Sequence, residues 1–175
     1  MKSTSTPTLK YALSMLAITT AIFALPATAS AAEPASCSTV RFSDVGWTDI
    51  TSTTAVATEI LKGLGYKTDI KVLSVPVTYA SLSKKDIDVF LGYWNPSMSA
   101  DLKPYLDDKS VETLRTNLTG AKYTLAVPKY AYDEGLKDFK DIAAFKDKLG
   151  GKIYGIEPGN DGNRLIPAMI TKDPL

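Results

Sequence analysis

The sequence predicts an α/β protein with a mainly parallel sheet, and two observations lead to that prediction. Short runs rich in β-branched and aromatic residues alternate with stretches of helical periodicity, which is the order of parallel βαβ units. Near Gly120 the same alternation starts again, so we expect two α/β lobes. We assign residues 1–31 to a leader, residues 38–118 to a first lobe and residues 119–175 to a second lobe that is incomplete.

The first lobe shows its clearest pattern between residues 48 and 64. Val56, Ile60 and Leu64 recur every four residues there, which predicts a helix with these side chains on its buried face, flanked by Ile50, Ala57 and Leu61. A pair of glycines marks the end of this helix. The other elements expected in this lobe are strands at 39–45, 66–75 and 86–94, a short helix at 76–85, a helix at 98–108 that Pro104 interrupts, and an extended segment at 110–118.

The second lobe is predicted to begin with a strand over residues 121–128. A charged helical region at 129–149, a second strand at 151–159 and a helix that opens at 160–170 follow it. Two strands and one unfinished helix would leave a sheet edge open. We therefore expect this lobe to be incomplete in the given chain.

The first 31 residues have the layout of a secretory signal peptide. Lys2 and Lys10 precede an apolar run from Tyr11 to Leu25, and the small-residue stretch ATASAA follows Pro26. The run is too short to span a membrane, and its carboxyl flank resembles a cleavage site. We expect export, with cleavage near residue 31 or 32.

Composition excludes several classes of function. The formal net charge is +1, and loss of Lys2 and Lys10 with the leader leaves 18 basic and 19 acidic residues, so no nucleic-acid partner is expected. The chain contains no histidine, which removes Ser-His-Asp and Cys-His catalysis and His-ligated zinc. We therefore expect no catalytic residues, no metal and no cofactor. Cys37 is the only cysteine, and it is either free or without its partner in this chain.

Both tryptophans of the chain follow predicted strands. Trp47 lies in DVGWTDI after the first strand, and Trp94 lies in DVFLGYWNPSM after the third. The carboxyl ends of parallel strands meet at one edge of a sheet, where ligands bind in such folds, so we expect both indoles at that edge. Either indole alone could be partial core packing. Together they suit a flat or cationic ligand, above all a quaternary ammonium, which offers no hydrogen bonds and is attracted to π faces.

Three further residues are candidates for contact with such a ligand. Asp49, two residues after Trp47, could equally be a helix cap or a first-turn residue, and Asp44 is a competing carboxylate on the same loop. Tyr123 begins a predicted strand, where a tyrosine usually packs. Asn160 lies in the glycine-rich turn EPGNDGNRL, where its plainer role is an N-cap that Asp161 could supply equally well, and the turn lacks the spacing of phosphate-binding motifs.

Four stretches together resemble the periplasmic substrate-binding proteins of ABC importers for quaternary amines, and most closely the choline-binding members. They are VRFSDVGWTDI, DIDVFLGYWNPSM, GAKYTLAVP and YGIEPGNDGNR, and the resemblance runs from about Val40 to the end of the chain. It implies a two-lobed periplasmic-binding-protein fold of type II, whose lobes close over the ligand. It also implies that the walls of an aromatic box are Trp47, Trp94 and Tyr123. It further implies that the residues in contact with the polar end of the ligand are Asp49 and Asn160.

The resemblance implies a monomeric binding protein that captures choline between its lobes in the periplasm and delivers it to the permease of an ABC importer. Choline is preferred because its hydroxyl and its positive charge suit Asp49 and Asn160. Glycine betaine or proline betaine is the alternative, but Asp49 would repel a betaine carboxylate, which would want an arginine, a lysine or free backbone N–H groups. None of the three arginines is adjacent to the proposed walls, although Arg164 lies on the loop of Asn160. A remote alternative is an exported enzyme that uses Asp44, Asp49 or Glu157 as acid or base.

Overall fold

The structure is a computed structural model that describes residues 34–172. The predicted signal peptide therefore lies outside the described residues. The chain divides into two units, Met1–Ala35 and Ser36–Leu175, and the description that follows concerns the second. A short 3₁₀ helix, η1 (Ala35–Cys37), comes first, and the thiol of Cys37 is free and exposed.

Three parallel strands form the sheet, in the order β2-β1-β3. Their bounds are β1 (Thr39–Asp44), β2 (Lys67–Val72) and β3 (Val89–Phe90). Helix α1 (Thr48–Gly63) connects β1 to β2, and helix α2 (Val75–Ser83) connects β2 to β3. The predicted α/β class with a parallel sheet is confirmed.

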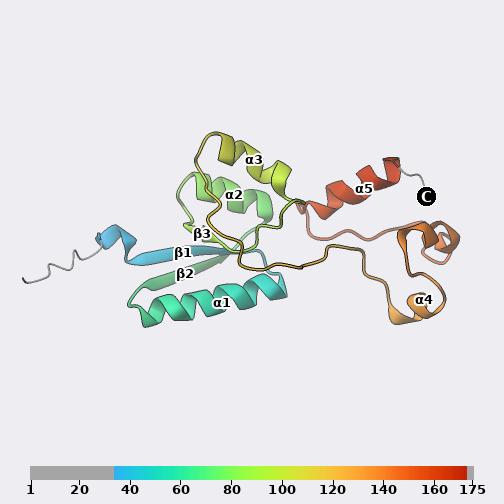
Figure 1. Ribbon diagram of the computed structural model, residues 1–175, viewed down its shortest axis with the longest axis horizontal. Coiled ribbons are helices and arrows are strands. Elements are labelled where there is room, and N and C mark those ends of the chain that lie inside the picture. The colour runs from blue at the N-terminus through green and yellow to red at the C-terminus, as the bar shows by residue number, and fades with distance from the viewer. Residues whose placement is uncertain (1–33, 173–175) are drawn as a thin grey trace, which may run out of the picture. The chain divides into compact units, whose positions relative to one another are not determined.

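Alternation along β1 sends neighbouring side chains to opposite faces of the sheet. The hydroxyl of Ser43 lies 2.6 Å from that of Thr78 in α2, whereas the next residue, Asp44, accepts a hydrogen bond of 2.7 Å from Thr51 in α1. Figure 1 shows the result, with α1 on one face of the sheet and α2 on the other, beside α3 (Ser99–Asp107). The central strand is therefore covered by helices on both faces, as parallel sheets require.

The buried core gathers around Tyr79, which is 2% exposed. Its ring meets Phe90 edge-on, with the centroids 5.9 Å apart, and its hydroxyl lies 3.4 Å from the sulfur of Met98. Burial raises the pKa of Tyr79, so its hydroxyl stays protonated. The cluster of buried apolar residues comprises Val45, Ile50, Val75, Tyr79, Met98 and Leu102.

Helix α1 turns a different face to the sheet from the one predicted. The predicted face, Val56, Ile60 and Leu64, is at least 60% exposed. The buried residues are Ile50, which was predicted to flank this face, and Thr54 and Thr58. The prediction was therefore right for Ile50 and wrong for Val56, Ile60 and Leu64, because the side of α1 that packs against β1 and β2 carries threonines that an apolar pattern does not show.

Two predicted elements differ in extent. Strand β3 spans two residues instead of 86–94, and a side chain at Gly92 would lie 2.7 Å from the ring of Phe90, so the chain leaves the sheet in a close turn over its own strand end. Helix α3 continues through Pro104, where a break was predicted. The proline ring removes one backbone hydrogen bond, yet the carbonyl of Pro104 still accepts from the N–H of Asp108 at 3.2 Å.

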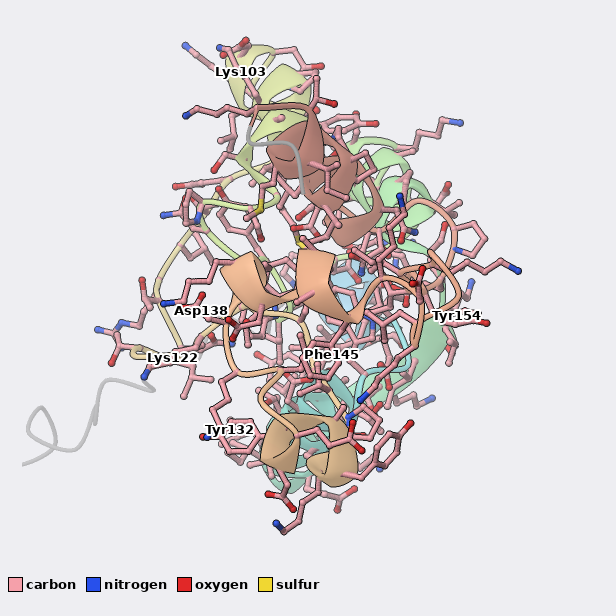
Figure 2. All side chains as sticks on the ribbon, turned by 90° about the vertical axis from the view of Figure 1, so that its right-hand side faces the viewer. Lys103, Lys122, Tyr132, Asp138, Phe145 and Tyr154 are labelled. Carbon is pink, nitrogen blue, oxygen red and sulfur yellow. The ribbon has the colours of Figure 1, made fainter. Side chains whose placement is uncertain are left out.

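From residue 119 onward the described residues form helices but no strand. The elements are α4 (Lys129–Asp133), η2 (Phe139–Asp141), η3 (Ala143–Phe145) and α5 (Gly162–Lys172). The strands predicted at 121–128 and 151–159 were wrong for the described chain, because neither segment pairs with a neighbouring strand there. Figure 2 looks onto side chains of this region, among them Tyr132 and Tyr154, which are 51% and 86% exposed.

Truncation of Phe42 tests the described packing of the central strand. Phe42 is 2% exposed, so Phe42→Ala should lower the free energy of unfolding by about 3–5 kcal/mol through lost contacts and a residual cavity. Val56→Ala is the control, and at a site that is 62% exposed it should change that free energy by less than about 0.5 kcal/mol. Urea unfolding followed by circular dichroism measures both, and equal losses in the two variants would contradict the packing.

Candidate functional site

The carboxyl ends of β1 and β3 bring both tryptophans to the same edge of the sheet. The two strands pair in parallel, with Phe42 opposite Val89, so Trp47 and Trp94 follow neighbouring strand ends. Trp47 is the N-cap residue of α1 and has an extended backbone conformation. Both indoles are partly buried and pack against the core cluster. The predicted shared edge is confirmed, and each indole also takes part in packing.

Tyr123 meets Trp94 from a distant part of the sequence. Their ring centroids are 5.8 Å apart with an interplanar angle of 46°, within the range in which aromatic rings attract one another. Tyr123 is 51% exposed, so much of its ring is open to solvent. Partial burial, together with the negative charges of Asp161 and Glu157, raises the pKa of Tyr123. Its hydroxyl is therefore protonated at neutral pH and can donate a hydrogen bond.

A tight turn at residues 157–160 carries the polar groups that face these rings. The N–H of Asn160 donates to the carbonyl of Glu157 at 3.2 Å, and Gly159 has a φ of +86°. Proline at the second position and glycine with positive φ at the third are the signature of a type II turn. A Cβ at Gly159 would also lie 3.0 Å from Pro76 in α2, so glycine suits both the turn and the close approach.

Asn160 is the buried centre of a partly buried hydrogen-bond network. It is 5% exposed, and its Oδ1 accepts from the Tyr123 hydroxyl at 3.1 Å and from the N–H of Gly162 at 2.9 Å. Its Nδ2 donates to Glu157 at 2.9 Å. The bond to Gly162 lies at the start of α5, where Asp161 occupies the position directly before the first helical residue. Among the described residues one hydrogen of Nδ2 is left without an acceptor, so Asn160 can still donate once.

The carboxylate of Glu157 joins this turn to the first tryptophan. Its Oε1 accepts from Nε1 of Trp47 at 2.9 Å as well as from Asn160. Contacts therefore run without a gap from Trp47 through Glu157 and Asn160 to Tyr123, whose ring meets Trp94. Sequence reasoning considered Glu157 only as an acid or base and missed this role. The sequence analysis recognised a glycine-rich turn here, but nothing in the sequence indicated a partner 110 positions away.

The two carboxylates near Trp47 have different surroundings. Asp44 is 5% exposed and accepts hydrogen bonds from the N–H of Gly46 at 2.8 Å and from the hydroxyl of Thr51 at 2.7 Å, so it holds the start of α1. Asp49 lies in the first turn of α1 and is exposed, and its carboxylate makes no hydrogen bond or ion pair with the described residues. Asp49 is thus outside the network and available, whereas Asp44 is engaged.

Acidic groups dominate the surroundings of the turn. Asp161 is 3% exposed, and its Oδ2 has no hydrogen-bond partner among the described residues. Arg164, the one arginine on this loop, pairs with Asp101 of α3 at 2.7 Å. Neither Asp161 nor Glu157 forms an ion pair with any residue that the structure describes. The charge of the site is therefore better suited to a cation than to an anion.

Gly162 allows the network to close. A Cβ at this position would collide with the hydroxyl of Tyr123 and lie 3.2 Å from Oδ1 of Asn160. Any side chain here would therefore push Tyr123 away from Asn160. Sequence reasoning noted Gly162 only as part of a glycine-rich turn, because the approaching tyrosine is far away in the chain.

The remaining candidates for a site lie away from these residues. Within residues 34–172 no helix is long and apolar enough to cross a membrane, and no group of three or more His, Cys, Asp or Glu side chains could bind a metal ion. An apolar depression is present, but none of the five predicted ligand residues lines it. Its lining residues are Leu125, Phe139, Ile142, Ile153, Ile166, Met169 and Ile170.

Two known proteins are similar in sequence. A Chromohalobacter salexigens protein named Uncharacterized protein ORF1 is 53% identical over 141 residues, which is 81% of this chain and 89% of that protein. The glycine betaine/carnitine transport binding protein GbuC of Listeria monocytogenes is 36% identical over 92 residues, or 52% of this chain and 30% of GbuC.

Two solved structures are similar in both sequence and fold. An ABC-transporter choline binding protein in complex with choline is 71% identical with a TM-score of 0.75, and the match covers 81% of this chain and 49% of that one. A choline binding protein in an unliganded semi-closed conformation is also 71% identical, with a TM-score of 0.69 and coverage of 79% and 48%. This chain thus spans about half the length of both solved chains.

The similarity extends to a whole family. The family model described as the substrate binding domain of ABC-type glycine betaine transport systems matches residues 38–175. The parallel sheet, the two tryptophans at its edge and the turn that faces them all lie inside the matched residues. This chain therefore belongs to the family of substrate-binding domains of ABC-type glycine betaine transport systems.

Proposed function

We propose that this chain captures choline and holds its trimethylammonium group against the rings of Trp47, Trp94 and Tyr123. One observation carries the proposal: the contact of Trp94 with Tyr123 at 5.8 Å, which hydrogen bonds through Asn160 and Glu157 extend to Trp47. Residues that are far apart in the sequence thereby converge on one aromatic and acidic site. A methylated cation is the ligand class that such a site suits.

Similar proteins support the same class of ligand. The solved structure with 71% identity contains choline, and the Listeria relative is named for glycine betaine and carnitine. These three molecules share a trimethylammonium group, whose nitrogen cannot accept or donate a hydrogen bond. Aromatic faces attract it instead, and each contributes about 0.5–2 kcal/mol.

The polar groups favour choline over its alternatives, glycine betaine and proline betaine. A betaine carries a carboxylate, which an arginine could bind. Arg164, the arginine on the loop of Asn160, is already paired with Asp101. The hydroxyl of choline can accept from the remaining N–H of Asn160 and donate to the available carboxylate of Asp49. Both contacts are proposed, and both use groups that make no hydrogen bond with the described residues.

The family to which this chain belongs acts in transport. Members of this family are transport binding proteins rather than enzymes, and they act in the periplasm or outside the cell. We extend this to the present chain, with export by the predicted leader, capture in the periplasm and delivery to an ABC permease. Closure of the two predicted lobes would exclude water and complete the cage around the cation.

Removing one ring of the proposed box should weaken binding. Trp94→Ala and Tyr123→Ala should each reduce the choline affinity of this chain by about two- to thirtyfold, since each removes a π face worth about 0.5–2 kcal/mol. Isothermal titration calorimetry with choline measures the affinity. Tyr154→Ala is the matched control, because this tyrosine is 86% exposed and outside the site. Unchanged affinity in both site variants would refute the aromatic box.

The carboxylate of Asp49 should decide between choline and betaines. Asp49→Asn should weaken choline binding and leave glycine betaine binding equal or tighter, because it removes an attraction for the first ligand and a repulsion for the second. Competition between the two ligands measures the selectivity. Asp147→Asn, at an exposed aspartate elsewhere, serves as the control. Equal losses for both ligands would contradict the proposed role of Asp49.

A methyl group at Gly162 should disturb the site without touching the ligand. Gly162→Ala should displace the Tyr123 hydroxyl from Asn160 and lower choline affinity, because the new Cβ occupies the place of that hydroxyl. Gly63→Ala is the control, since a Cβ at Gly63 meets no atom within 4 Å. Calorimetry and thermal unfolding of both variants separate a local effect on the site from a general loss of stability, and wild-type affinity in Gly162→Ala would rule out the described contact.

A further inference from the structure

We propose that Glu157 is the positioning residue of the site, a side chain that fixes the orientation of the Trp47 indole relative to the Asn160 amide. This inference rests on the proposed function of the same site. It assigns to Glu157 a task that is distinct from direct contact with the ligand. The hydrogen bonds of its carboxylate carry the argument.

Both bonds converge on a single oxygen. Oε1 of Glu157 accepts from Nε1 of Trp47 at 2.9 Å and from Nδ2 of Asn160 at 2.9 Å, whereas Oε2 has no hydrogen bond among the described residues. Bonds to an ionised acceptor are shorter and stronger than those between neutral groups. One acceptor thus fixes the plane of an indole that follows β1 and the plane of an amide that precedes α5. These are an aromatic and a polar member of the proposed site.

Glu157 is itself held firmly in place. The side chain of Asn163 in α5 donates to the carbonyls of Ile156 and Glu157 at 3.1 and 3.0 Å and accepts from the N–H of Ile156 at 3.0 Å. On its other side the type II turn begins, and its Gly159 packs against Pro76. The backbone that carries the carboxylate is therefore bonded before and after it, so the position of Oε1 is fixed by the fold rather than by the ligand.

Orientation of the indole matters because the attraction of a cation to an aromatic ring is directed at its face. An indole that rotates about its side-chain bonds would turn its edge to the cation and lose that attraction. Packing against the core cluster limits this rotation for Trp47, and the bond from Nε1 to Glu157 restricts the freedom that remains. The amide of Asn160 is held by two bonds to Oδ1 and by the bond from Nδ2 to Glu157, which anchors its nitrogen end.

Substitution by alanine and by glutamine separates positioning from charge. Glu157→Ala removes the acceptor, so choline affinity should fall by about tenfold, which corresponds to about 1.4 kcal/mol. Glu157→Gln keeps an oxygen at the Oε1 position, with its amide nitrogen in the place of the unbonded Oε2, and should recover most of that loss. Glu112→Ala, at an exposed glutamate after α3, should leave the affinity unchanged.

A second measurement does not depend on any ligand. The chain has two tryptophans, so a proton–nitrogen spectrum of indole-labelled protein contains two Nε1–H resonances, and Trp94→Phe assigns them. In the ligand-free chain Glu157→Ala should shift the Trp47 resonance and speed its hydrogen exchange, while Glu157→Gln should keep both close to those of the parent. The Trp94 resonance should stay in place in either variant.

The outcomes distinguish this inference from the proposed function. Absence of choline binding by the parent chain would sink the proposed function, while the indole spectrum would still decide whether Glu157 holds Trp47. An unmoved Trp47 resonance in Glu157→Ala would overturn the positioning role. So would a Glu157→Gln variant that binds choline as weakly as Glu157→Ala, since the charge would then be the contribution that counts. Circular dichroism of each variant confirms that it is folded before it is compared.

Discussion

Parallel pairing of β1 with β3 is the constraint on which the site depends. Because the two strands run in the same direction, their carboxyl ends lie at one edge of the sheet, and the residues that follow them emerge together. Trp47 and Trp94 are separated in the chain by α1, β2, α2 and β3, yet the pairing places them after neighbouring strand ends. An antiparallel arrangement of the same strands would have sent the two indoles to opposite edges.

A network of polar hydrogen bonds then orients the side chains that lie at this edge of the sheet. Asn160 and Glu157 exchange hydrogen bonds with groups from three separate parts of the chain, and such networks define a geometry more strictly than apolar packing does. Water is largely excluded from Asn160, so loss of one partner would leave a buried polar group without compensation. The same reasoning makes Asp161 notable, because its Oδ2 is buried without a partner among the described residues and adds negative charge beside the site.

The elements that were predicted well are those set by local chemistry. The parallel βαβ order, the glycine-terminated first helix and the proline at the start of α2 depend on residues close in sequence. The failures arose where a distant partner decides. The buried side of α1 is decided by its packing against β1 and β2, and the segments at 121–128 and 151–159 could become strands only with a neighbour to complete their hydrogen bonds.

For the site, the sequence by itself determined which residues carry useful chemistry: two indoles after strands, a first-turn aspartate, a strand-like tyrosine and an asparagine in a turn. Only the tertiary structure decided how these residues meet. Contacts that include Glu157 join Trp47, Asn160, Tyr123 and Trp94, while Asp49 lies outside this network. Asp44 accepts a hydrogen bond at the start of α1, and Arg164 pairs with Asp101. The reason is physical: the character of a side chain is local, whereas a hydrogen bond across 110 positions exists only once the backbone between them has folded.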